Sequence, residues 1–154
     1  MSTSPESVEE DAHETNDDKH LTFVIGEGSY ALHISHVTEI IEMQTVTSIP
    51  NAPRHVRGII NLRGKVIPVV DVRACLCMEE RPYDSRTCII VVHEESPVGL
   101  VVDTVREVVD VPPEAVLDAP AVGEHSDAGY ITGIAKMEDS TQIILDFRKL
   151  LASR

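Results

Sequence analysis

Apolar residues occur along this chain in short runs that turn-forming residues separate. The clearest case is the pair of runs at residues 59–62 and 66–70, which are rich in Ile and Val and lie on either side of Arg63-Gly64-Lys65. This pattern is typical of a β-hairpin in which Gly64 supplies the positive φ of the turn. Because Pro68 cannot donate a hydrogen bond within the second run, we expect that strand to lie at a sheet edge or to carry a bulge.

Similar runs predict strands throughout the rest of the chain. Their expected ranges are 21–26, 29–34, 37–43, 88–93, 98–103, 105–111, 130–137 and 141–145. The three runs between residues 88 and 111 are almost continuously aliphatic, which predicts burial on both faces. Short helices are expected at 72–76, where Asp71 is placed as the N-cap, at 114–117 and at 147–151.

The two halves of the chain resemble each other when they are aligned. An ungapped alignment places Glu39 on Glu107, and one insertion in the second half then places Asp71 on Asp146. A strand followed by Asp-x-Arg could recur simply because both copies need the same strand end and helix cap. We interpret the matches as an internal duplication, which predicts five strands and a short helix in each half.

This organisation predicts an all-β fold of two five-stranded barrels, with residues 21–76 forming the first and residues 87–151 the second. The polar stretch 77–86 is expected to link them. Residues 1–20 hold seven acidic residues against one lysine and show no apolar periodicity. A segment of this composition cannot bury enough surface to offset its ordering entropy, so we expect a disordered acidic tail followed by one folded domain over 21–154.

Charge and composition limit the classes of partner. The formal net charge of −13 argues against nucleic acid or an anionic membrane surface as the main partner, because both require clustered Lys and Arg. No apolar run approaches the roughly 20 residues that cross a bilayer, and the acidic N-terminal region does not resemble a signal peptide. We therefore expect a cytoplasmic protein, without direct membrane insertion, that binds other proteins.

Candidate catalytic and metal-binding residues do not form a recognisable motif. His33, His36 and Glu39 could begin a metal site, but no spacing supplies further ligands. Three cysteines without C-x-x-C spacing are expected to be reduced and mostly buried: Cys75, Cys77 and Cys88. The sequence therefore predicts no catalytic residue, metal or cofactor, and a small β-barrel enzyme or metal protein stays as the less favoured alternative.

The chain resembles the CheW family, the coupling proteins of bacterial chemotaxis, in the order and spacing of five runs. These are TFVIGEGSYALHISHVTEI, IPNAPRHVRGIINLRGKVIPVVDVR, TCIIVV, VGLVVDTVREVV and YITGIAKMEDSTQIILDFRKLL, which together cover about residues 21–151. The resemblance implies two SH3-like β-barrels and no catalytic activity. It also implies an adaptor that bridges the cytoplasmic signalling tip of chemoreceptors to the regulatory domain of a CheA-type histidine kinase, at receptor arrays on the inner membrane.

Candidate binding residues follow partly from the resemblance, which places receptor binding in the region matching Val37, Glu39 and Arg63. With their neighbours, the receptor candidates are Val37, Glu39, Ile40, Asn61, Arg63 and Gly64. The kinase candidates are Val105, Val108 and Gly133. Val37 and Ile40 could anchor an amphipathic helix, although core packing is the alternative and fits Ile40 better than Val37. The three kinase candidates are also of types that more often belong to a core.

A pairing of Glu39 with Arg63 is a separate hypothesis from the residues themselves. A bidentate contact would hold the hairpin turn against the strand at 37–43, whereas the alternative is two solvated surface charges. Ile41-Glu42 departs from a common family form, which has Arg-Gly there, and this leaves the receptor class open. An adaptor of a pilus-motility or other chemosensory pathway is therefore a second reading of the same resemblance.

Overall fold

The computed structural model describes residues 18–93, 95–117 and 130–152, and the predicted tail lies mostly outside these ranges. The strands are β1 (Lys19–Ile25), β2 (Gly28–His33), β3 (Val37–Glu42), β4 (Val56–Leu62), β5 (Lys65–Asp71), β6 (Cys88–His93), β7 (Pro97–Val102), β8 (Thr104–Asp110), β9 (Val116–Leu117), β10 (Ile131–Lys136) and β11 (Thr141–Leu145). The helical segments are η1 (Ile34–His36), α2 (Val72–Cys75), η2 (Pro113–Ala115) and α3 (Phe147–Ala152). The prediction of an all-β fold with short helices is confirmed.

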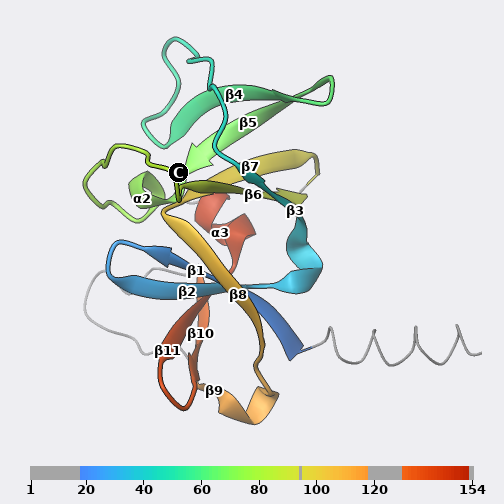
Figure 1. The fold of residues 1–154 in the computed structure, drawn as a ribbon, viewed down its shortest axis with the longest axis vertical. Helices are drawn as coiled ribbons and strands as arrows, with labels where there is room; N and C mark the ends of the chain where they lie inside the picture. Colours follow the sequence, from blue (N-terminus) through green and yellow to red (C-terminus); the bar gives the residue numbers. More distant parts are fainter. Residues whose placement is uncertain (1–17, 94, 118–129, 153–154) are drawn as a thin grey trace, which may run out of the picture.

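The strands form two sheets that lie one above the other (Figure 1). One sheet has the order β8-β1-β2-β11-β10-β9, and the other has the order β3-β6-β7-β5-β4. Each sheet therefore takes two adjacent strands from one half of the chain and the remainder from the other half. The sheets do not coincide with the barrel ranges 21–76 and 87–151, because β1 and β2 join the last strands of the second half, and β6 and β7 join β3, β4 and β5.

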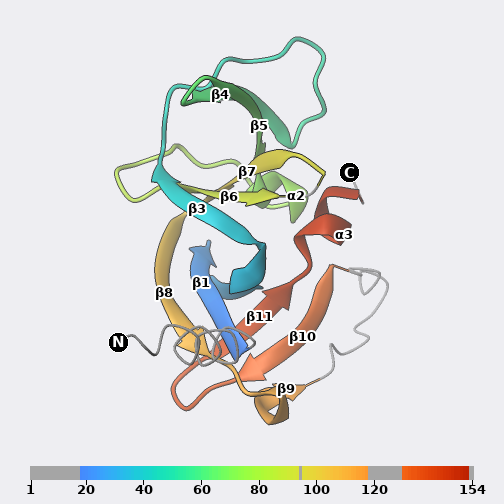
Figure 2. The same cartoon turned by 90° about the vertical axis from the view of Figure 1, so that its right-hand side faces the viewer.

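Strands β3 and β8 lie on one side of the junction between the sheets, and the two α-helices lie on the other. Figure 2 shows β3 and β8 on one side and α2 and α3 on the other. Both parallel pairings, β5 with β7 and β11 with β2, join the two halves of the chain. Parallel strands cannot be joined by a tight turn, so this interleaving requires the long connections that the sequence provides.

The structure supports the internal duplication at the level of single hydrogen bonds. The Asp71 N–H donates to the carbonyl of His55 at 2.8 Å, and the Asp146 N–H donates to the carbonyl of Tyr130 at 2.7 Å. Each aspartate also accepts a hydrogen bond at the start of the following helix, from Arg73 N in the first copy and from Arg148 N in the second. Asp71 is thus the N-cap that we predicted.

The main hydrophobic core lies between the two sheets, because its buried residues come from both sheets and both α-helices. Its largest buried side chains include Leu21, Phe23, Ile90, Leu100 and Phe147. Full burial of side chains of this size stabilises a fold by roughly 1.5–3 kcal/mol each. Two smaller clusters fill the individual barrels. The inter-sheet core therefore fixes how the barrels are placed relative to each other.

The position of Pro68 corrects one prediction. β5 lies between β7 and β4, so it is not an edge strand, and the irregular pairing with β4 occurs between Val56 and Gly58 rather than at the proline. The pairing with β7 begins at Val69, immediately after Pro68. The missing N–H is tolerated because the parallel ladder starts one residue later.

Burial and the observed element bounds differ from several further predictions. β8 contains only half-buried and exposed residues, so it is not buried on both faces as β6 and β7 are. The 114–117 segment is a 3-10 turn followed by a two-residue strand. Of the three cysteines only Cys75 is buried, since Cys77 is exposed and Cys88 is half-buried. β1 starts at Lys19, two residues before the predicted strand at 21–26.

Candidate functional site

The turn between β4 and β5 has the backbone geometry that Gly64 predicts. Arg63 and Gly64 both have positive φ, +52° and +87°, and the Gly64 N–H donates to Asn61 Oδ1 at 2.9 Å. Two central residues with positive φ between directly paired strands are typical of a tight hairpin turn that matches the strand twist. A Cβ at Gly64 would meet nothing within 4 Å. Glycine is therefore favoured there by φ, not by space.

Arg63 reaches from this turn to Glu39 on β3. Its Nη2 donates a hydrogen bond to Glu39 Oε2, and the Arg63 side chain remains 68% exposed against 29% for Glu39. The predicted pairing is confirmed, but it joins one nitrogen to one oxygen instead of forming the bidentate contact that we expected. An exposed pair of this kind stabilises a fold by about 0–1 kcal/mol. Its main effect is to orient the guanidinium.

A hollow of about 340 Å³ lies beneath the Glu39–Arg63 pair. Its apolar wall comes from Leu62, Ile67 and Val91. The remaining lining residues are Thr38, Glu39, Arg63, Lys65, His93 and Pro97. We call this opening, between β3 and the β4–β5 turn, the mouth of the first barrel. It combines an apolar interior with two exposed cationic side chains, Arg63 and Lys65, at its rim.

β3 presents alternate residues to the core and to the outside. Val37 packs against the main core and Ile41 against the cluster inside the barrel, whereas Ile40 is 42% exposed. Our expectation that Ile40 suits a core position better than Val37 is wrong. Strand alternation decides the matter, since Ile40 points away from the face that Glu39 and Ile41 share.

The three kinase candidates do not form one cluster. Val105 packs against the main core, and Val108 is 46% exposed on β8. Gly133 is buried on β10, which does not adjoin β8 in the sheet. A Cβ at Gly133 would approach Val116 Cγ1 to 2.8 Å, so this glycine allows β9 to lie close to β10. Only Val108 offers an exposed apolar surface.

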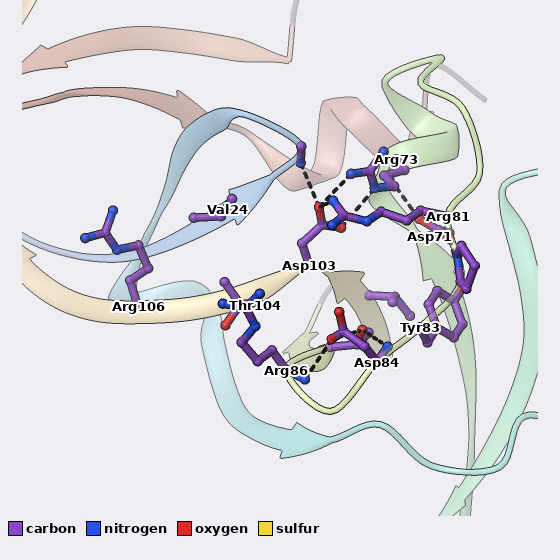
Figure 3. Close-up of a pocket in the computed structure, with 14 residues that line it drawn as sticks. Val24, Asp71, Arg73, Arg81, Tyr83, Asp84, Arg86, Asp103, Thr104 and Arg106 are labelled. Atoms are coloured by element: carbon purple, nitrogen blue, oxygen red, sulfur yellow. Dashed lines mark hydrogen bonds and ion pairs between the residues drawn. The ribbon is translucent and has the colours of Figure 1, made fainter.

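Sequence reasoning did not identify the ion-pair network at the junction of the sheets, which Figure 3 shows. Asp103 accepts hydrogen bonds from Arg73 Nε at 2.9 Å, Arg73 Nη2 at 2.7 Å and the Gly26 N–H at 2.7 Å. Burial would raise the pKa of Asp103, but the bonds from Arg73 and Gly26 outweigh burial and lower it. The network joins α2 to the β1–β2 turn. Its sequence signal is an acidic residue that directly follows an aliphatic strand.

Asp71 forms a second network beside the first. It is 2% exposed and accepts hydrogen bonds from Tyr83 Oη at 2.8 Å and Arg57 Nε at 3.2 Å as well as from the helix. Burial and then the bond to Asp71 raise the pKa of Tyr83 to about 12. Arg57 also lies 3.5 Å from Glu80. Through Tyr83 and Glu80, these contacts hold the predicted linker, residues 77–86, against β4 and β5.

The histidines form ring contacts but no metal centre within the described ranges. His20 and His33 lie edge to face with ring centroids 5.0 Å apart, and His33 and His36 lie 6.0 Å apart. Burial lowers the pKa of His20. No cluster of three or more His, Cys, Asp or Glu residues suited to a metal ion occurs in the described part of the chain.

In the same ranges, no helix combines the length and the apolar character of a membrane span.

Comparison with protein families gives a match to the CheW-like domain over residues 19–154. The chain belongs to the CheW-like domain family. The matched range begins at the first residue of β1 and covers both sheets. The CheW-like chain thus uses all of its described strands in one family domain.

Curated relatives of the CheW-like chain cover most of its length. It is 34% identical over 143 residues to the chemotaxis protein CheW of Klebsiella aerogenes, covering 92% of this chain and 86% of the relative. It is 34% identical to the chemotaxis protein CheW of Treponema pallidum, with 87% and 82% covered. Protein FrzA of Myxococcus xanthus is 29% identical, with 84% and 82% covered.

A solved structure has the same fold as the CheW-like chain. The scaffolding protein TtCheW of Thermoanaerobacter tengcongensis superposes with a TM-score of 0.77 at 35% sequence identity, covering 83% of this chain and 88% of that one. The family and these relatives make the CheW-like chain an adaptor of chemotaxis signal transduction.

Proposed function

We propose that this chain is a non-enzymatic adaptor that couples the cytoplasmic signalling tip of chemoreceptors to the regulatory domain of a CheA-type histidine kinase. The observation that carries the proposal is the family match over residues 19–154, supported by similarity to a solved scaffolding protein. These partners would recruit the protein to receptor arrays at the cytoplasmic face of the inner membrane.

The receptor face that we propose is the mouth of the barrel beneath the Glu39–Arg63 pair. Its apolar hollow and its exposed Arg63 and Lys65 suit an amphipathic helix that offers apolar and acidic side chains. Ile40 is exposed on the other face of β3, so it is a separate candidate contact outside the hollow. Asn61 and Gly64 shape the turn that carries Arg63. Val37 does not face the partner; it packs against the main core and holds β3 in place.

The kinase face that we propose is the outer edge of β8. This strand lies at one end of its sheet, and an edge strand exposes backbone groups and alternate side chains to a partner. Val108 is the apolar contact on this surface, with Val105 holding the strand to the core. Gly133 lies outside this edge, because it packs β9 on β10 at the other end of the sheet order.

Co-sedimentation with a purified receptor signalling fragment and a CheA-type kinase tests this function. We expect the protein to enter a ternary complex and to increase kinase autophosphorylation relative to receptor and kinase alone. Omission of the protein is the matched control. A protein that sediments with neither partner and leaves kinase output unchanged would contradict the adaptor function. Metal content of the isolated protein separately tests the metal-protein alternative.

A second pathway is a specific alternative because FrzA of Myxococcus xanthus is among the relatives. The chain could serve another chemosensory pathway, such as one that controls pilus motility, with the same two faces. Binding to receptors and kinases of each pathway, compared in parallel, distinguishes the two readings. Stronger coupling to the partners of the second pathway would select it.

A further inference from the structure

A second hollow, of about 310 Å³, lies at the junction of the two sheets and away from the β4–β5 turn (Figure 3). Val24 and Gly26 line it from the end of β1, and Thr104 and Arg106 line it from β8. The loop that precedes β6 closes another side with Arg81, Pro82, Tyr83, Asp84, Arg86 and Thr87. Four arginines and three aspartates therefore line this hollow, with Arg106 set apart from the others on β8 (Figure 3).

The aspartates of this hollow are already used by the fold. Asp103 binds Arg73 and the Gly26 N–H, and Asp71 binds Tyr83, Arg57 and the first turn of α2. Asp84 accepts the Arg86 N–H at 2.8 Å, and this bond is the main reason that the pKa of Asp84 is lowered. Their negative charge is therefore directed into local contacts.

Two of the arginines keep their cationic groups available. Within the described ranges, no hydrogen bond or ion pair joins the guanidinium groups of Arg86 and Arg106 to another residue, and both residues are exposed. Arg81 Nη1 lies 3.4 Å from Asp103 Oδ2, which is a long ion pair, and the Arg81 side chain is 54% exposed. The hollow is thus cationic on a chain whose formal net charge is −13. Guanidinium groups in such a place suit carboxylates.

We propose that the acidic N-terminal segment of this chain, residues 1–17, binds in cis to the hollow through carboxylate contacts to Arg86 and Arg106. This segment lies outside the described ranges and contains six acidic residues and no Lys or Arg. An acidic segment from another protein would be repelled by the net charge of the chain at long range. A tethered segment avoids this barrier, because the tether gives it an effective concentration of about millimolar order.

The length of the segment is sufficient for this contact. Lys19 pairs with Asp110 at one end of the β1–β8 ladder, and Val24 pairs with Thr104 at the hollow. The interval from Lys19 to Val24 corresponds to about 17 Å at roughly 3.3 Å per strand residue. Seventeen residues can span up to about 56 Å when extended. The segment can therefore return along β8 to Arg106 and then to Arg86.

The test measures binding of a fluorescent synthetic peptide with the sequence of residues 1–17 by fluorescence anisotropy at low salt. A deletion variant that begins at Asp18 should bind the peptide, and the full chain should bind it at least about tenfold more weakly because its own segment competes. Asp18 is retained because its carbonyl accepts the Val111 N–H at 2.8 Å. High salt should abolish binding, since salt screens exposed charges.

Charge reversal locates the site. In the deletion background, Arg86→Glu and Arg106→Glu should each weaken peptide binding at least about fivefold, whereas Arg54→Glu, with the same change in net charge at an exposed residue elsewhere, should change it less than about twofold. Equal weakening by all three variants, equal affinity of the full and deleted chains, or no binding by the deleted chain would each overturn the proposal. Circular dichroism verifies that the variants are folded.

Discussion

The mouths of the two barrels occupy equivalent positions in the repeat but differ in chemistry. Where the first copy pairs Arg63 with Glu39, the second has Glu138 and Glu107, which carry like charges. The second mouth opens on a hollow of about 560 Å³ that Glu107, Glu138 and Asp139 line with Arg106. The shared scaffold therefore does not require the Arg63–Glu39 pair, and this difference supports a binding role for the first mouth.

The walls of the two mouths also differ, because the first is apolar and the second is partly polar. The alignment of the two halves, together with the strand pairings, places the wall residues of the first mouth on those of the second. Leu62, Ile67 and Val91 correspond to Met137, Gln142 and Thr22. Gln142 and Thr22 are buried and hydrogen-bonded, Gln142 to Ser29 and Thr22 to the backbone of Glu107. An apolar wall remains available to a partner only in the first copy.

The largest expected effect is a difference in stability loss between two glycines at equivalent repeat positions. Gly58 has φ +147°, and a Cβ there would lie 2.0 Å from the Thr47 carbonyl oxygen. Gly133 has no positive φ, and a Cβ there would lie 2.8 Å from Val116 Cγ1 and 3.0 Å from the Leu117 carbonyl oxygen. We expect Gly58→Ala to lower the free energy of unfolding by about 3 kcal/mol and Gly133→Ala by about 1 kcal/mol. Urea denaturation measures both. Equal losses would show that the two copies pack alike at this position.

The next effect concerns Asp103, which occupies the repeat position of Ser35. Asp103→Asn should lower the free energy of unfolding by about 2 kcal/mol at pH 7, because it weakens the charge-assisted bonds from Arg73. Ser35→Ala, at an exposed residue, should cost less than about 0.5 kcal/mol. Chemical denaturation of both variants compares the two equivalent repeat positions. A loss of unfolding free energy in Ser35→Ala equal to that in Asp103→Asn would contradict the expected difference between them.

The same aspartate predicts a dependence on pH. Its pKa is lowered in the folded state from an ordinary value of 3.8. A lowered folded-state pKa contributes stability that is present above the unfolded-state pKa and is lost as pH falls through the folded-state pKa. The stability difference between the wild-type chain and Asp103→Asn should therefore shrink below about pH 4. Urea midpoints measured between neutral pH and acid pH test this, and a constant difference would exclude the linkage.

Charge reversal at the turn gives the next smaller change in free energy. Arg63→Glu places a carboxylate opposite Glu39, as in the second copy, and should weaken receptor binding about tenfold while leaving the fold intact. Arg54→Glu controls for net charge, and Glu138→Lys tests the equivalent position of the other mouth. Both should change receptor affinity less than about twofold. Unchanged receptor affinity and kinase stimulation in Arg63→Glu would contradict the proposed receptor face.

The smallest effect is the stability contribution of the Arg63–Glu39 pair itself. Arg63→Ala and Glu39→Ala in a double-mutant cycle should give a coupling energy of about 0.5 kcal/mol or less, since Arg63 is mostly exposed. Thermal or urea denaturation provides the measurement. A coupling well above the range of exposed ion pairs would mean that the pair is mainly structural.

Sequence could predict the local elements because their signals are local. Gly64 and the aliphatic runs beside it identify the hairpin, and Asp71 identifies the helix cap. The interleaving of the halves could not be predicted, because a strand pattern does not specify which sheet a strand joins. β3 and β8 look like members of their own halves until their pairing with β6 and β1 is known.

The same limit applies to the candidate site. Opposite charges suggested the Glu39–Arg63 contact, but the exposure of Ile40 depends on which face of β3 meets the core. Asp103 was missed because its partners, Arg73 and Gly26, are distant in sequence and meet only when the sheets pack. Gly133 is a packing residue, which its sequence position alone does not distinguish from a binding residue.

The most direct test of the difference between the two mouths is an NMR titration of the protein with an unlabelled receptor signalling fragment. We expect backbone amide shifts to change at residues 61–65 and along β3, while residues 137–142 at the second mouth keep their shifts. Changes confined to residues 137–142, or equal changes at both mouths, would contradict the assignment of receptor binding to the first mouth.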